Sequence, residues 1–338
     1  MSTTLTRRHG QLLAVAATAL LTVSACSSNQ PPQSSPETTS SPAASRYNIT
    51  FINGNAANAF AITLGCGMQT EAEKLGVNLT VNGPSAFDPT VQIPIVHAVT
   101  AQKPDGVVIE PTDATALAAP MKQMAAAGIK VAEVDTTIDD TSFVVSSVTS
   151  DNASGGKLAA ASMSELLGDA SGPILVLDIG PGSTSTNQRA KGFTDEAPNH
   201  PNLNVLPVQF TGNDATKTAS VVKATLAAHP DLAGIVATSN QQSEAAIPAL
   251  KVAGKNPGDV KIVAFDSDAA QIEHLKSGDV QTLITQQVRQ MGATALDNLV
   301  NALDGKDVTV KQSIEMVAIS ADQADTAETQ ALVYSDKC

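Results

Sequence analysis

The sequence predicts an α/β protein with two doubly wound lobes, each built on a parallel β-sheet. Short apolar segments alternate with amphipathic helical segments along most of the chain, a pattern typical of parallel sheets that helices cover on both faces. The alternation runs through two successive halves without a long internal linker, and 338 residues are more than one domain usually holds. Because ligands of open parallel sheets bind beyond the carboxyl ends of the strands, two such lobes predict a cleft between them.

The first half contains five predicted strands separated by helices. The strand at 49–53 precedes a helix over 58–75, and Gly76 suits the left-handed residue that ends a helix. A second helix begins at Asp88 and Pro89, because aspartate caps a helix and proline fits the first turn. The other predicted strands of this half cover 77–81, 106–110, 131–134 and 144–148.

The second half repeats the scheme with five more apolar strands. Helices of the amphipathic kind fall between them, for example over 215–228 and 241–253. The predicted strands are 174–177, 205–210, 235–237, 261–265 and 281–285.

The N-terminal segment has the pattern of an export signal. Arg7 and Arg8 precede an apolar run over 12–23, which is too short to span a bilayer. The run ends in Val-Ser-Ala-Cys and resembles a bacterial lipobox, which implies cleavage after residue 25 and lipidation of Cys26. An ordinary cleaved signal with an incidental cysteine is the alternative. Export by the general secretory or by the twin-arginine route stays open.

A tether follows the predicted lipidation site, over residues 26–46. Eleven of the twenty residues 27–46 are Ser or Pro, and no apolar periodicity is present. Such a segment cannot bury enough apolar surface to fold, so it predicts a spacer between the membrane and a folded part that begins near Tyr47.

Composition excludes several classes of function. The formal charge of −13 disfavours a nucleic-acid partner, which needs a basic face. The five histidines and three cysteines show no metal-ligand spacing, and no phosphate-binding loop or nucleophile elbow is present. Gly180-Pro181-Gly182 resembles only a fragment of a dinucleotide fingerprint. We therefore expect no catalytic residue, metal or cofactor.

Polar residues gather where the predicted strands end. Asn53 ends such a strand, Asp135, Ser239 and Asp266 come after one, and both halves contribute. Amides, carboxylates and hydroxyls offer the donors and acceptors that recognise a ligand rich in hydroxyl groups. Helix capping is the alternative use of such residues, and it applies in particular to four aspartates, Asp88, Asp135, Asp214 and Asp268.

Several motifs together resemble a known family. They are Asn58-Ala59-Phe60, residues 71–76 (Glu-Ala-Glu-Lys-Leu-Gly), Ser150-Asp151-Asn152 with Gly155-Gly156, residues 228–231 (Ala-His-Pro-Asp) and Phe265-Asp266. In this order and spacing they resemble the periplasmic ribose-binding proteins, and more closely the sugar-binding lipoproteins of actinobacteria, over residues 48–320.

The resemblance implies the type I periplasmic binding protein fold with three hinge crossings. These fall near Ser150 and Asp151, near Gln286 and Gln287, and near Glu315. Lobe 1 would then comprise residues 47–150 and 287–315, and lobe 2 residues 151–286 and 316–338, including a C-terminal tail.

The resemblance also implies a set of ligand-binding residues in the cleft. At one position the alignment with the family can fall on Ser239 or on Asn240, so both are included. Carried over position by position, the residues are Asn53, Asn58, Phe60, Asp135, Thr136, Asn187, Arg189, Asn213, Ser239, Asn240, Asp266 and Gln286.

Some of these positions depart from the ribose-binding pattern. Thr136 and Asn187 stand where the family usually has arginines, although Arg189 is two residues from the second. Ala61 replaces a second aromatic residue beside Phe60. Without these guanidinium groups and this ring, the site is poorly suited to ribose itself, so a small polyol, a furanose or a modified sugar is expected.

Two cysteines remain after the predicted lipidation of Cys26. Cys66 faces away from the apolar stripe of its helix, and Cys338 ends the chain. Two lone thiols in an exported protein suggest one disulfide, and related lipoproteins often have cysteines at both positions. Two free thiols are the alternative.

The predicted function is that of an exported, lipid-anchored solute-binding protein. It would capture a small sugar or polyol in the cleft, as a monomer facing the periplasm or cell-wall space, and deliver it to the permease of an ABC importer. Two alternatives stay open, a receptor that reports the bound ligand to a membrane sensor and an exported enzyme on the same scaffold.

Overall fold

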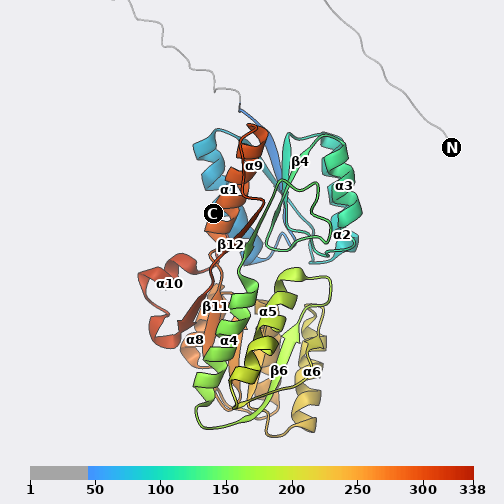
Figure 1. Cartoon of the computed structure of the whole chain (residues 1–338). Coiled ribbons are helices and arrows are strands. Elements are labelled where there is room, and N and C mark those ends of the chain that lie inside the picture. Colours follow the sequence, from blue (N-terminus) through green and yellow to red (C-terminus); the bar gives the residue numbers. More distant parts are fainter. Residues whose placement is uncertain (1–44) are drawn as a thin grey trace, which may run out of the picture. The chain divides into compact units, whose positions relative to one another are not determined.

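The computed structural model describes residues 45–338 and contains two parallel sheets flanked by helices (Figure 1). The predicted signal segment, Cys26 and nearly all of the predicted tether lie outside these residues. Each sheet with its helices forms one lobe, so the prediction of a two-lobed α/β fold is confirmed.

Lobe 1 is built on a six-stranded sheet in the order β12-β5-β4-β3-β1-β2, and every neighbouring pair is parallel. Its elements in chain order are β1 (Asn48–Ile52), α1 (Ala59–Leu75), β2 (Asn78–Asn82), α2 (Pro89–Gln102), β3 (Gly106–Ile109), α3 (Ala118–Ala126), β4 (Lys130–Val134), β5 (Ser146–Ser150), α9 (Val288–Leu303) and β12 (Lys311–Ile314).

Lobe 2 is built on a seven-stranded sheet in the order β13-β11-β10-β9-β6-β7, with β8 also paired to β6 and only β13 antiparallel. Its elements are α4 (Asn152–Leu167), β6 (Gly172–Asp178), α5 (Thr184–Glu196), the 3-10 helix η1 (Ala197–Asn199), β7 (Leu203–Val205), β8 (Gln209–Phe210), α6 (Ala215–Ala228), β9 (Gly234–Ala237), α7 (Asn240–Val252), β10 (Lys261–Phe265), α8 (Ala269–Ser277), β11 (Thr282–Thr285), β13 (Val317–Ser320), the 3-10 helix η2 (Ala321–Gln323) and α10 (Ala327–Leu332).

Successive residues of the central strands fill different cores, because side chains of a strand alternate between the faces of its sheet. In β1, Phe51 packs with residues of α1 and α9, whereas Ile52 packs with residues of α2 and α3. In β6, Leu175 and Val176 divide in the same way between the two cores of lobe 2. The central strands of each sheet are therefore buried on both faces, and their carboxyl ends are where polar side chains can face a ligand.

Of the four aspartates that could either cap a helix or bind a ligand, three cap helices. Asp88, Asp214 and Asp268 each accept a hydrogen bond from a backbone N–H in the first turn of α2, α6 and α8. Asp135 begins no helix. It follows β4 with a positive φ of 63°, so its side chain is free for another use.

Two sequence-based expectations about strands need correction. The single strand expected over 205–210 is two short strands, β7 and β8, because Pro207 between them has no N–H for the ladder. The strand expected at 144–148 lies two residues later, at Ser146–Ser150. The strands β12 and β13 were not predicted from the sequence.

Within the described residues, the chain passes between the two sheets three times. These passages follow β5, follow β11 and separate β12 from β13. The side chains of the crossings contact one another: Ser150 donates a 2.8 Å hydrogen bond to Gln286, and Gln287 donates a 3.0 Å bond to the carbonyl of Glu315. The carboxyl ends of the strands of both lobes meet beside these crossings.

Candidate ligand-binding cleft

A cavity lies between the carboxyl ends of the two sheets. Lobe 1 contributes to its wall Asn55, Asn58, Phe60, Ala61, Phe87, Glu110 and Asp135; lobe 2 and the hinge contribute Ile179, Ser183, Ser185, Thr186, Arg189, Asn213, Ser239, Asn240, Gln241, Asp266 and Gln286. The lobes touch at its rim, where the Ala114 N–H donates a 3.0 Å hydrogen bond to the carbonyl of Gly182. The structure therefore shows the lobes closed on each other.

Backbone conformation singles out three residues of the wall. Among residues 45–338, four non-glycine residues have a positive φ, and three of them, Asp135, Asn213 and Asp266, line the cavity. For residues other than glycine, a positive φ costs free energy, and residues in this conformation concentrate at functional sites. The turn after each strand thereby directs a polar side chain into the cleft.

Arg189 is the one cation that residues 45–338 contribute to the cavity wall. Its side chain comes from α5, is only 3% exposed, and stacks 4.9 Å from the centre of the Phe265 ring. It donates hydrogen bonds to the Asn152 side chain (2.8 Å) and to the Thr238 carbonyl (2.9 Å). These contacts fix the plane of the guanidinium, which a sugar hydroxyl or carboxylate can then meet at defined angles.

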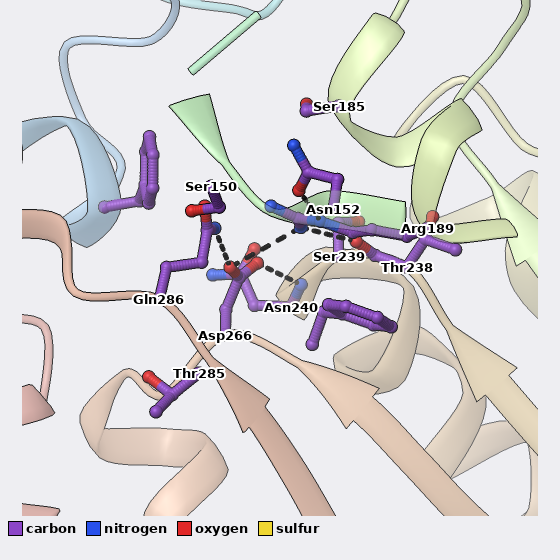
Figure 2. Close-up of polar contacts among 12 residues, drawn as sticks. Ser150, Asn152, Ser185, Arg189, Thr238, Ser239, Asn240, Asp266, Thr285 and Gln286 are labelled. Atoms are coloured by element: carbon purple, nitrogen blue, oxygen red, sulfur yellow. Dashed lines mark hydrogen bonds and ion pairs between the residues drawn. The ribbon is translucent and has the colours of Figure 1, made fainter. Parts of the chain in front are cut away.

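Asp266 lies where both lobes and the hinge meet (Figure 2). Its carboxylate accepts a 2.8 Å hydrogen bond from the Gln286 side chain and a 3.0 Å bond from the Asn240 backbone N–H. Arg189 lies 3.8 Å from it. Figure 2 shows these side chains converging on Asp266. The carboxylate is thus held in one orientation before any ligand arrives.

Asp135 faces the same space from lobe 1. Its Oδ2 atom accepts hydrogen bonds from Thr136 (3.1 Å) and from Ser185 of lobe 2 (3.3 Å). Its buried Oδ1 atom has no hydrogen-bond partner, and the Arg189 guanidinium is 4.0 Å away. Burial raises the pKa of Asp135, and the nearby guanidinium opposes that rise. An unpartnered buried acceptor is costly, so Oδ1 is suited to a ligand hydroxyl.

Glu110 is a third carboxyl group in the cleft, and sequence reasoning missed it. It follows β3 and accepts a 2.7 Å hydrogen bond from the Gly54 N–H. Burial, and then the charge of Asp135, raise its pKa well above the usual range. The neutral form that these effects favour can both donate and accept a hydrogen bond.

Two aromatic rings line the lobe 1 side of the cavity. Phe60 lies in the first turn of α1, and Phe87 comes from the loop before α2. A side chain at Gly54 would meet the Phe87 ring within 3.0 Å, so glycine lets this ring approach. The second aromatic residue that is missing at Ala61 is therefore supplied by Phe87 from elsewhere in the chain.

The structure places nine of the twelve predicted site residues on the cavity wall, and their ligand contacts stay predictions. Asn58, Phe60, Asp135, Arg189, Asn213, Ser239, Asn240, Asp266 and Gln286 line it. Ser239 and Asn240, the two alternatives for one family position, both line the cavity. The Ser239 hydroxyl donates a hydrogen bond to the Asn213 side chain (3.0 Å), and the Asn240 backbone N–H donates one to the Asp266 carboxylate.

The other three predicted residues do not line the cavity, and their ligand contacts likewise stay predictions. The side-chain oxygen of Asn53 lies against the backbone of Gly83. Thr136 bonds Asp135, so it orients that carboxylate. Asn187 donates 2.7 Å hydrogen bonds to Asp178 and to the Gly180 carbonyl, which holds the loop after β6.

Within residues 45–338, no group of three or more His, Cys, Asp or Glu side chains is arranged to hold a metal ion. Among the helices of the same residues, none is long and apolar enough to cross a membrane.

Comparison with known proteins gives consistent matches. The family model of the periplasmic binding protein domain matches residues 49–307. The ribose import binding protein of Salmonella typhimurium is 31% identical over 281 residues, which cover 82% of this chain and 92% of that protein. The ribose import binding protein of Bacillus subtilis is 27% identical over 289 residues, which cover 86% and 92%.

A solved structure agrees with this. It is a crystal structure of an ABC transporter solute-binding protein from Agrobacterium vitis bound with alpha-D-tagatopyranose. It is 33% identical to this chain and superposes with a TM-score of 0.83 over 86% of this chain and all of its own.

Proposed function

The chain belongs to the periplasmic binding protein domain family, and from this premise we propose that it captures a small sugar or polyol in the interlobe cleft and delivers it to an ABC importer permease. Its relatives show that the protein is a sugar-binding solute-binding protein of the ribose type. Delivery, lipid anchoring and the identity of the solute belong to the proposal.

The observation that supports the proposal most is the unpartnered Oδ1 atom of Asp135. It lies 4.0 Å from the Arg189 guanidinium, in a closed cavity whose wall is polar at strand ends and aromatic at Phe60 and Phe87. A vicinal pair of hydroxyls can donate to such a carboxylate and accept from such a guanidinium. The aromatic faces suit the C–H face of a ring or an extended polyol.

Relatives indicate where the search for the solute begins. Two similar proteins are ribose import binding proteins. A third, the solute-binding protein from Agrobacterium vitis, is bound with alpha-D-tagatopyranose in its crystal structure. Phe87 provides the second aromatic ring that position 61 does not. The rings of Phe60 and Phe87 can therefore pack on a pyranose as well as on a furanose. We propose that the solute is an uncharged pentose, hexose or alditol.

A thermal-shift panel tests this. D-Ribose, D-tagatose and a series of pentoses, hexoses and alditols are added singly, and a true ligand at 100 times its Kd adds about 2.7 kcal/mol to the stability of the protein. Recovery of the ligand unaltered after incubation separates binding from catalysis. A panel in which no sugar or alditol raises the melting temperature contradicts the proposal.

Membrane anchoring is the second part of the proposal. The apolar run, the Val-Ser-Ala-Cys sequence and the Ser/Pro-rich segment over 27–46 support a diacylglyceryl group on Cys26 and a spacer that holds the binding lobes away from the bilayer. Two or three acyl chains anchor firmly, whereas a single chain gives only reversible binding.

A further inference from the structure

The last six residues run from lobe 2 to lobe 1, and we call residues 333–338 the C-terminal strap. On lobe 2, the Tyr334 N–H donates a 3.0 Å hydrogen bond to the Ser267 carbonyl. On lobe 1, the next residue, Ser335, donates a 2.8 Å bond from its N–H to the Thr63 hydroxyl of α1. Consecutive residues of the strap are thus attached to different lobes.

Lobe 1 holds the strap by further contacts. Arg289 of α9 donates a 2.9 Å hydrogen bond to the Ser335 hydroxyl. Cys338 forms a disulfide with Cys66 of α1, with Cα atoms 5.3 Å apart. In Figure 1 the chain end lies beside α1, whereas α10, which precedes the strap, lies with lobe 2. Cys66 is only 2% exposed, so its side of α1 is covered.

Tyr334 connects the strap to the ligand site. It is fully buried, and its ring meets the Phe60 ring edge to face with centres 5.7 Å apart. Its hydroxyl accepts a 3.2 Å hydrogen bond from the Gln286 N–H and donates a 3.4 Å bond to Asp266. One side chain therefore contacts a cavity residue of lobe 1, one of the hinge and one of lobe 2.

The Tyr334 hydroxyl is suited to this position. Burial, and then the charge of Asp266, raise the pKa of Tyr334 well above 10. The hydroxyl therefore keeps the proton that it donates to Asp266 at any physiological pH.

From these contacts we propose that the C-terminal strap is a fourth, disulfide-closed connection between the lobes, which limits the opening of the empty cleft and positions Phe60 and Asp266 through Tyr334. Opening at this edge would have to separate Tyr334 from Ser267 or Ser335 from Thr63. The disulfide keeps the lobe 1 end attached while such bonds break and reform. Because the empty protein is already restricted, it loses less conformational entropy when a ligand binds, and the affinity for the ligand is higher.

The first test requires no ligand. Small-angle scattering of the ligand-free protein is compared with that of the variant Cys66→Ser/Cys338→Ser. The proposal predicts a larger radius of gyration for the variant, because its lobes open further. Identical profiles for the two folded proteins would overturn the limit on opening.

The second test addresses Tyr334 and depends on the proposed function for its probes, D-ribose and D-tagatose. Tyr334→Phe keeps the ring against Phe60 and removes the bonds to Gln286 and Asp266. The expected result is a loss in affinity of roughly fivefold or more, at the lower end of typical couplings between sites.

Tyr47→Phe is the matched control. Tyr47 likewise donates a hydrogen bond to an aspartate, Asp304, at 3.0 Å, but it lies away from the cavity wall. Equal affinities for the parent, Tyr334→Phe and Tyr47→Phe would overturn the positioning role. If neither sugar binds the parent, the proposed function fails for these probes, and the scattering comparison still decides whether the strap limits opening.

Discussion

The guanidinium of Arg189 lies 4.0 Å from the carboxylate of Asp135, although the two residues belong to different lobes. The same guanidinium lies 3.8 Å from Asp266. All three residues are at least 94% buried, so the Arg189 cation separates two carboxylates that closure brings toward each other. Closing the lobes therefore assembles the charged part of the cleft.

Replacing this cation tests that arrangement. In Arg189→Met, two buried carboxylates lose their shared positive partner, which is strongly unfavourable. Sugar affinity should fall tenfold or more in calorimetric titration. Lys191→Met, on the same helix but exposed, should bind like the parent. An unchanged affinity in Arg189→Met would show that the closed arrangement does not depend on the cation.

Glu133 makes stability depend on pH. Burial raises its pKa from 4.5 to about 7, so between these values the folded protein keeps a proton that the unfolded chain has lost. The free energy of unfolding should therefore fall as pH rises through this window, by about 3 kcal/mol from this group. Glu133→Gln should flatten the slope in urea unfolding measured at pH 4.5 to 7. The exposed Glu73→Gln should keep the slope of the parent, and a parent-like slope in Glu133→Gln would refute the assignment.

The disulfide has a direct chemical test. Thiol titration of the denatured, unreduced protein should detect no free thiol from Cys66 or Cys338, and reduction should release both. Closing so long a loop lowers the entropy of the unfolded chain and thereby adds at most roughly 6 kcal/mol to the free energy of unfolding. Two reactive thiols before reduction would contradict the covalent closure of the strap.

Anchoring is tested by fractionation of cells. Cys26→Ala should move the protein from membranes to the medium or the soluble fraction, because the acyl chains supply the membrane affinity and a chain with a formal charge of −13 is not attracted to anionic lipid. Equal membrane association of the parent and Cys26→Ala would exclude the lipid anchor.

The fold was predictable because its signals are local. Continuous apolar strands alternate with capped helices, and Gly76 and Asp88 end and begin helices as expected. The split of 205–210 into two strands depends on Pro207, whose effect could have been anticipated. The strands β12 and β13 have mostly polar or exposed residues, so their apolar pattern is too weak to reveal them.

The site was predictable only in part. Asp135 and Asp266 follow apolar strands, and this rule also applies to Glu110, which follows β3. Phe87 could not be found in this way, because a loop carries it to the cavity. Asn187 and Arg189 lie on the same helix two residues apart, and only packing decides that Arg189 faces the cleft. Tyr334 reaches the site from the chain end, which no local pattern indicates.

Calorimetric titration of Asp135→Ala and Asp266→Ala tests the central claim most directly, that one sugar or polyol binds between carboxylates from opposite lobes. The probe is the sugar or alditol that stabilises the parent. Because hydrogen bonds to charged groups contribute roughly 1.5–3 kcal/mol each, either substitution should weaken binding about ten- to a hundredfold or more. Asp279→Ala is the control, since Asp279 bonds Lys251 just before β11, at the opposite end of the strands, and it should leave affinity unchanged. Parent-like affinity in both Asp135→Ala and Asp266→Ala would place the ligand elsewhere and contradict the account.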